Sequence, residues 1–215
     1  MSGTTSGRRW AGLLAVVCGL AAGTAAAEGT AGPVCLSPEQ RATVQARLGP
    51  GGEADWMRLP KELGLPEAAL VQALPASQVA SVGGDRFMDT WALLQKWSNP
   101  IVFVFKGGHV FEIHGPLPPG QPSKVSKYFN LQQEGAGVSG HLRPDLITQI
   151  IAVNRKVRGR VQAAVMFFDA TGEQAFAVFI PEGPESGVPK EMPEFEATRA
   201  AMSAWPDPCQ TGERK

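Results

Sequence analysis

The feature that most constrains the fold is a change in hydrophobic period at Asn99-Pro100. Before this point, Phe87, Trp91 and Leu94 recur at the i, i+4, i+7 spacing of an amphipathic helix. After it, residues 101–105 form a β-branched and aromatic run that is typical of a strand. Because helical and strand patterns occupy separate stretches, they do not alternate as they would around a parallel sheet.

Four helices are expected before residue 100 and one near the C-terminus. Ser37-Pro38-Glu39-Gln40 forms a capping box with proline at the first helical position, and Leu48-Gly49-Pro50 ends the helix that it starts. The other helices are expected at residues 54–63, 66–74, 85–97 and 193–204.

Seven strands are expected, at residues 101–105, 109–114, 128–132, 141–142, 147–155, 161–169 and 174–180. Lys106-Gly107-Gly108 is typical of a hairpin turn, as is the segment 169–173. This order predicts an α+β fold, a mainly antiparallel sheet with the N-terminal helices and a C-terminal helix packed on one face. We expect a single domain at 37–205, helical over 37–98 and sheet over 101–180, with a tail at 206–215.

The first 27 residues have the three-part pattern of a secretory signal peptide. Arg8-Arg9 precedes an uncharged apolar stretch, and Ala25-Ala26-Ala27 satisfies the cleavage rule. The apolar stretch is too short for a membrane span, so we expect no stable membrane insertion. A signal peptide at 1–27 and a flexible leader at 28–36 predict a periplasmic or secreted protein, whereas a misassigned start codon would leave it cytoplasmic.

Removal of that segment would leave two cysteines, Cys35 and Cys209, one at each end of the domain. In an oxidising compartment they could form a disulfide. Metal binding is the weaker alternative, because neither has a second Cys or His two to four residues away.

The sequence argues against several other classes of protein. The formal net charge is zero and Lys and Arg do not cluster, so there is no electrostatic pattern for nucleic acid. The helices expected at 54–63 and 66–74 have helix-turn-helix spacing, but the second contains no Lys or Arg. Nucleotide-binding, serine-hydrolase and zinc-protease motifs are absent. The remaining donors are His109, His114, His141 and Tyr128, residue types that are more often structural.

Several short segments occur in a distinctive order along the mature chain: 84–87 (GDRF), 111–120, 128–131 (YFNL), 139–142 (SGHL), 154–156 and 165–172. In this order they resemble the ChuX/HutX family of haem-utilisation proteins over residues 65–202. The resemblance implies an α+β fold, a homodimer and a haem held in a cleft at the sheet. It also implies a carrier that accepts haem from a donor protein after uptake and passes it to an acceptor.

Site residues follow from the same resemblance. His141 matches a family histidine implicated in haem binding, and Tyr128 matches a tyrosine that serves as an axial ligand in relatives; both side chains suit haem iron. Arg155 and Lys156 could pair with the haem propionates, or could form a solvent-exposed strand end. Phe105 stands where some relatives carry a histidine, and it cannot bind iron.

His109 and His114 could replace that missing histidine. Strand alternation places them on opposite faces, so at most one of them reaches a given cleft. The expected function is reversible haem binding without catalysis. The alternative is a haem-modifying enzyme on the same fold, which degrades or reduces the tetrapyrrole. The family's cytosolic members lack the export signal expected here.

Overall fold

The computed structural model describes residues 32–49, 55–56, 58–132, 137–157, 159–184 and 187–210. The predicted signal peptide at 1–27 lies outside these residues, as do positions 28–31 of the predicted leader and 211–215 of the tail. None of the described helices is long and apolar enough to cross a membrane.

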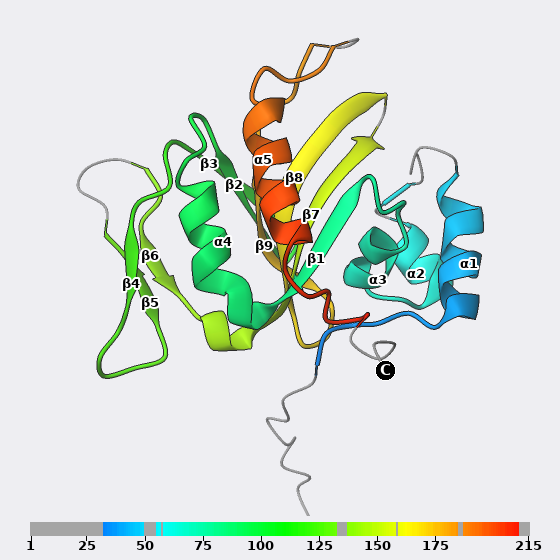
Figure 1. The fold of residues 1–215 in the computed structure, drawn as a ribbon, viewed down its shortest axis with the longest axis horizontal. Coiled ribbons are helices and arrows are strands. Elements are labelled where there is room, and N and C mark those ends of the chain that lie inside the picture. The colour runs from blue at the N-terminus through cyan, green and yellow to red at the C-terminus, as the bar shows by residue number, and fades with distance from the viewer. Residues whose placement is uncertain are drawn as a thin grey trace, which may run out of the picture.

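Six antiparallel strands form the central sheet, in the order β1-β7-β8-β9-β2-β3 (Figure 1). Their bounds are β1 (Val79–Gly83), β2 (Ile101–Lys106), β3 (His109–His114), β7 (Ile147–Val157), β8 (Arg160–Asp169) and β9 (Gln174–Phe179). The helices are α1 (Pro38–Leu48), α2 (Leu59–Leu63), α3 (Glu67–Gln72), α4 (Phe87–Leu94) and α5 (Met192–Ser203). The α+β fold and its antiparallel sheet are therefore confirmed.

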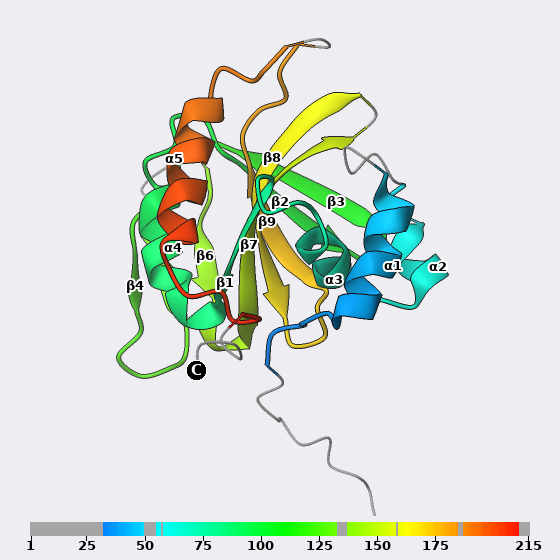
Figure 2. The same ribbon diagram turned by 45° about the vertical axis from the view of Figure 1, so that its right-hand side comes forward.

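Helices cover both faces of this sheet, which corrects the expectation that they pack on one face. In β7, Ile150 and Ala152 join the core under α4 and α5, whereas Ile151 and Val153 join a second core under α1–α3. Figure 2 shows the two helical groups on opposite sides of the strands. The reason lies in the continuous apolar run of residues 163–168 in β8, which is buried on both faces and so needs two covers.

A second sheet of three short strands lies beside α4, at the left of Figure 1. It consists of β4 (Gly120–Pro122), β5 (Phe129–Leu131) and β6 (Gly140–Leu142). Phe129 of β5 is 4% exposed and packs edge-on against Phe87 and Trp91 of α4, with ring centroids 5.6 and 6.2 Å apart. The Trp91 indole N–H also donates to the carbonyl of Pro118, 3.0 Å away. These contacts hold the small sheet to the main core.

The structure adds two strands that were not expected, β1 and β4, and shortens one expected helix. The sequence predicted no strand at β1, yet β1 pairs with β7 from Val79 to Gly83 and completes an edge of the sheet. The helix expected at 54–63 begins only at Leu59, because Pro60 is tolerated within the first turn of a helix and not in its interior. Within α3, residues 68–71 are fully buried, so this helix has no free apolar or basic face for a DNA groove.

Cys35 and Cys209 form a disulfide that joins the segment before α1 to the segment after α5. Their Cα atoms are 5.3 Å apart although 174 positions separate them in sequence. The Gln72 side-chain amide of α3 donates to Cys209 Sγ at 3.1 Å. The bridge therefore ties both ends of the domain to the core under α1–α3.

Candidate functional site

The outer face of the small sheet carries the two predicted iron donors. Alternation along β5 turns Phe129 and Leu131 toward the core and leaves Tyr128 and Asn130 on the other face. His141 of β6 pairs with Asn130 in register, so its side chain projects from the same face. Tyr128 and His141 therefore lie together, with ring centroids 5.8 Å apart, and Tyr128 is 42% exposed.

Asn130 orients the His141 ring. Its side-chain oxygen lies 2.8 Å from His141 Nδ1. Because an amide oxygen can only accept, this contact favours the tautomer in which Nδ1 carries the proton and Nε2 has the lone pair. Histidines that bind metals are usually held in this way, with the second ring nitrogen donating to an oxygen. Nε2 is thus prepared for coordination at an exposed surface.

A charged cluster lies next to the Tyr128 ring. The Arg143 guanidinium is 5.6 Å from the ring centroid and donates to both carboxylate oxygens of Asp145, at 2.7 and 2.8 Å. The hydrogen bonds from Arg143 lower the pKa of Asp145 to about 2, with a smaller contribution from Lys127 at 3.5 Å. The neighbourhood of Tyr128 keeps positive charge at neutral pH, which complements a phenolate or another anion.

The donor set fits an iron porphyrin. A neutral imidazole nitrogen and a phenol oxygen are both established axial ligands of haem iron. Because Tyr128 and His141 project from one face of one sheet, they would hold such a group from the same side. One of them would bind the iron, and the other would donate or accept a hydrogen bond beside it.

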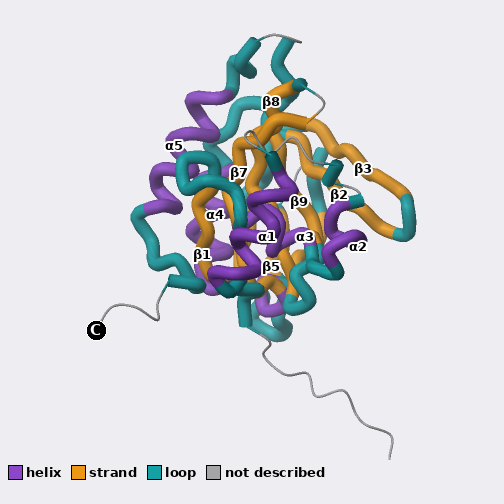
Figure 3. Tube along the Cα trace, turned by 90° about the vertical axis from the view of Figure 1, so that its right-hand side faces the viewer, coloured by secondary structure: helices purple, strands orange, loops and turns teal. Residues whose placement is uncertain are grey.

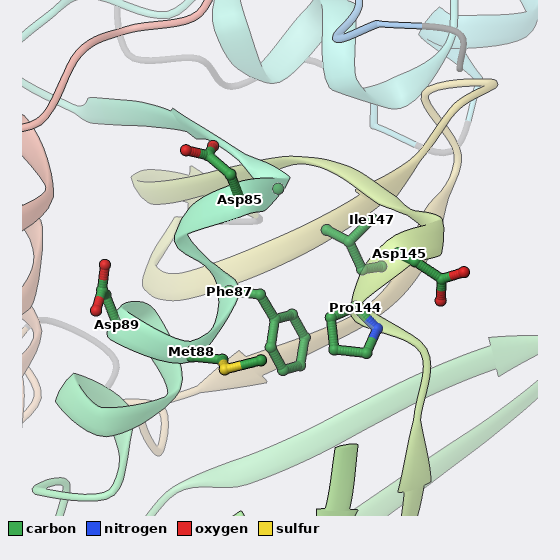
Figure 4. A pocket seen from close by; sticks show the side chains of 8 residues that line it. Asp85, Phe87, Met88, Asp89, Pro144, Asp145 and Ile147 are labelled. Atoms are coloured by element: carbon green, nitrogen blue, oxygen red, sulfur yellow. The ribbon is translucent and has the colours of Figure 1, made fainter. Parts of the chain in front are cut away.

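A cavity of about 530 Å³ adjoins this cluster and meets it at Asp145. Phe87, Met88 and Pro144 lie close together at its centre in Figure 4, and the carboxylates of Asp85 and Asp89 lie to one side. The acidic lining disfavours anionic ligands, so this cavity is a poor match for the propionates of haem.

Arg155 and Lys156 do not join Tyr128 and His141. Arg155 lies at the end of β7 on the face toward α1–α3, where its guanidinium stacks on Trp56 at 4.0 Å and pairs with Glu67 at 3.8 Å. Lys156 is exposed, and alternation turns it to the opposite face of the strand. The structure therefore brings together two of the four residues singled out from the sequence, Tyr128 and His141, and places Arg155 and Lys156 elsewhere.

The remaining histidines are exposed on β3, the edge strand. His109 pairs with Lys106 and His114 with Ile101, which places them on opposite faces as expected. Phe105 of β2 stacks on Phe103, with ring centroids 6.1 Å apart. Sequence reasoning missed Asn130 and Arg143, although the alternation in Tyr128-Phe129-Asn130 already placed Asn130 beside Tyr128.

The family model for haem utilisation ChuX/HutX matches residues 80–198, which is more than half of the chain. The chain belongs to this family. The match begins in β1 and ends within α5, so it includes the small sheet with Tyr128 and His141.

Three comparisons place this family member among known proteins. The "Intracellular heme transport protein HutX" of Vibrio cholerae is 28% identical over 138 residues, which are 64% of this chain and 70% of HutX. The crystal structure of ChuX superposes with a TM-score of 0.66 at 23% identity, covering 79% of this chain and all of ChuX. The Escherichia coli O157:H7 heme degrading enzyme ChuS has the same fold at 14% identity and a TM-score of 0.59. It matches over 78% of this chain and 49% of its own length.

Proposed function

We propose that this protein is a non-enzymatic haem carrier that binds haem reversibly at the outer face of the small sheet. The observation that carries the proposal is the Asn130–His141 hydrogen bond, which leaves His141 Nε2 available to bind iron. The His141 ring lies next to the Tyr128 ring, with centroids 5.8 Å apart. Its relative HutX is named as a haem transport protein, and Tyr128 and His141 lie in the segments through which this chain resembles the family.

A single axial bond suits a carrier. Burial of the apolar porphyrin supplies most of the affinity, and one donor fixes its orientation. The second donor, on the same side, stabilises the complex without a second iron bond. Arg143 and Lys127 provide positive charge near the donors for the propionates. Because Tyr128 and His141 are exposed in the haem-free protein, a donor protein can load the site and an acceptor can empty it.

The proposed carrier is a homodimer. Val110, Phe111 and Ile113 of the β2–β3 hairpin are exposed, and β3 is an edge strand with every residue exposed. An exposed apolar edge strand pairs readily with another chain. A second copy seated on this hairpin would cover the apolar surface. Sedimentation equilibrium should give twice the monomer mass, and Phe111→Lys should shift it toward the monomer.

The proposed location is outside the cytoplasm, after removal of residues 1–27. The Cys35–Cys209 disulfide supports this location, because such bonds persist in oxidising compartments. HutX, by contrast, is named as intracellular. Mass spectrometry of the protein from a periplasmic extract should show a mature N-terminus at Glu28. Recovery of an unprocessed, reduced chain from the cytoplasm would assign it to that compartment instead.

The carrier proposal is tested by haemin titration of the purified protein, followed by ascorbate in air. We expect one haem per chain, a Soret band that persists with ascorbate, and transfer of the haem to excess apomyoglobin. Asn130→Leu should weaken binding by about tenfold, because it frees the His141 ring to rotate. Loss of the Soret band only when ascorbate is present would favour the haem-modifying enzyme, and no coloured complex would refute both functions.

A further inference from the structure

A larger cavity of about 1120 Å³ lies on the other face of the main sheet, away from the small sheet. In Figure 3, α1–α3 lie in front of the strands that form its floor. Its lining comes from β2, β3, β7, β8 and β9, from the segments that follow β9 and precede α2, and from α3: Asp55, Trp56, Glu67, Ile101, Phe103, Phe105, Glu112, Arg155, Val157, Arg160, Gln162, Gln174, Phe179, Ile180 and Glu182.

The floor of this cavity is apolar. Phe103 packs edge-on against Phe179, with ring centroids 4.6 Å apart, and Phe105 stacks beside Phe103. Ile101 lies on the same face of β2 by alternation. These side chains are only partly covered by the protein, so they offer contact area to an apolar ligand.

A buried cation without a full set of partners lies in the same cavity. The Arg155 side chain is 8% exposed, its Nη2 is 3.8 Å from Glu67, and its Nη1 has no hydrogen-bond partner. Gln174 Nε2 is also buried and unpartnered. Burial lowers the pKa of Arg155 to about 10, although the negative charge of Glu67 acts in the opposite direction and raises it. Buried donors are nearly always paired, so Arg155 Nη1 indicates a missing acceptor at its end of the cavity.

The chemistry of the lining selects the acceptor. A carboxylate matches the planar guanidinium, which can donate two parallel hydrogen bonds to it. Among the residues that the structure describes, the lining contains no His, Tyr, Cys or Met to bind haem iron. Glu182 pairs with Arg160 at 3.1 Å, and Glu112 adds a negative charge that disfavours ligands with several anionic groups. One carboxylate on an apolar body satisfies all of these conditions.

We propose that this cavity is a second binding site, separate from Tyr128 and His141, for a monocarboxylate with an apolar body such as a medium-chain fatty acid. Arg155 binds the carboxylate, and Phe103, Phe105 and Phe179 contact the chain. The proposal does not rest on haem binding at the small sheet.

Calorimetric titration with decanoate, below its micelle concentration, tests the site. We expect one decanoate per chain, and binding at least about tenfold weaker for 1-decanol, which lacks the charge-assisted hydrogen bonds. Equal affinities for the two ligands, or no binding of decanoate, would overturn the proposal and leave ordered water as the partner of Arg155.

Variants assign the binding to these residues. Arg155→Met should weaken decanoate binding by about tenfold or more, whereas the matched control Arg143→Met on the small sheet should leave it unchanged. Glu67→Gln removes the competing anion and should tighten binding, which keeps the test decisive if Arg155→Met does not fold. Unchanged affinity in a folded Arg155→Met protein, or weaker binding in Glu67→Gln, would contradict the proposal.

Haemin distinguishes the two sites. Protein saturated with decanoate should bind haemin with the same affinity and Soret band as the free protein. Displacement of one decanoate by each haemin would show that this cavity holds haem, and it would overturn the claim of a separate site. A failure of haemin to bind at all would refute the carrier function and leave the decanoate result intact.

Discussion

Removal of the Cys35–Cys209 disulfide should cost a large part of the folding free energy. The bridge closes a loop with a sequence separation of 174 residues. For a loop of this length, the chain-entropy model gives about 5 kcal/mol of stabilisation, through restriction of the unfolded chain. Because domains are typically stable by only about 5–15 kcal/mol, the reduced protein should be marginal.

Urea unfolding followed by tryptophan fluorescence measures this cost, since Trp56, Trp91 and Trp97 are buried in the folded protein. The Cys35→Ser/Cys209→Ser protein should unfold at a much lower urea concentration than the oxidised protein. Its dependence on urea should also be steeper, because its unfolded chain exposes more surface. Wild-type protein with a reductant should match the double variant. Identical unfolding midpoints for the oxidised protein and the double variant would refute the reasoning.

Two further predictions concern the small sheet. Phe129→Ala should cost about 3–5 kcal/mol of folding free energy in urea unfolding, because it removes the ring that packs against Phe87 and Trp91 and leaves a cavity. Val125→Ala, at a side chain that is 96% exposed, is the control and should change stability by less than about 0.5 kcal/mol. Asp145 has its pKa lowered to about 2, so its stabilising contribution is present above the ordinary pKa of ~3.9 and is lost as the pH falls through about 2. The stability difference between wild type and Asp145→Asn should therefore shrink from pH 5 to about pH 2, and a difference that grows on acidification would contradict this assignment.

Local patterns predicted the elements that local chemistry determines. The capping box at Ser37 starts α1, and the backbone N–H of Gln40 donates to Ser37 Oγ at 3.2 Å. The turn at Lys106-Gly107-Gly108 joins β2 to β3, because both glycines adopt positive φ angles that other residues rarely take. The helix α5 and the long strands β7 and β8 also lie within a few residues of their expected bounds.

Elements that depend on distant contacts were not predictable in this way. The strand β4 lies in a Pro/Gly-rich stretch, and it forms where the Phe129 ring packs directly against Gly120. A side chain at Gly120 would collide with that ring, since its Cβ would lie 2.2 Å from Phe129 Cε1. The β1 strand likewise depends on pairing with β7, about seventy residues later in the chain.

The candidate site likewise combines features that local motifs predict with features that depend on distant contacts. Tyr128 and His141 were identified through motifs, but their proximity depends on the register that pairs Asn130 with His141. The burial of Arg155 depends on Trp56 and Glu67, which come from outside the sheet. Neither a motif nor a strand pattern contains that information, so the sequence left Arg155 as either a propionate partner or a solvent-exposed strand end.

The central claim is that haem iron is bound by Tyr128 or His141 on the outer face of the small sheet. Haemin absorption spectra of Tyr128→Phe, His141→Ala and the combined double variant test it most directly, with circular dichroism to verify folding. Each single variant should keep a coordinated but altered Soret band, because the other donor lies within reach, and the folded double variant should lose it. A double variant that retains the wild-type spectrum and affinity would contradict the claim.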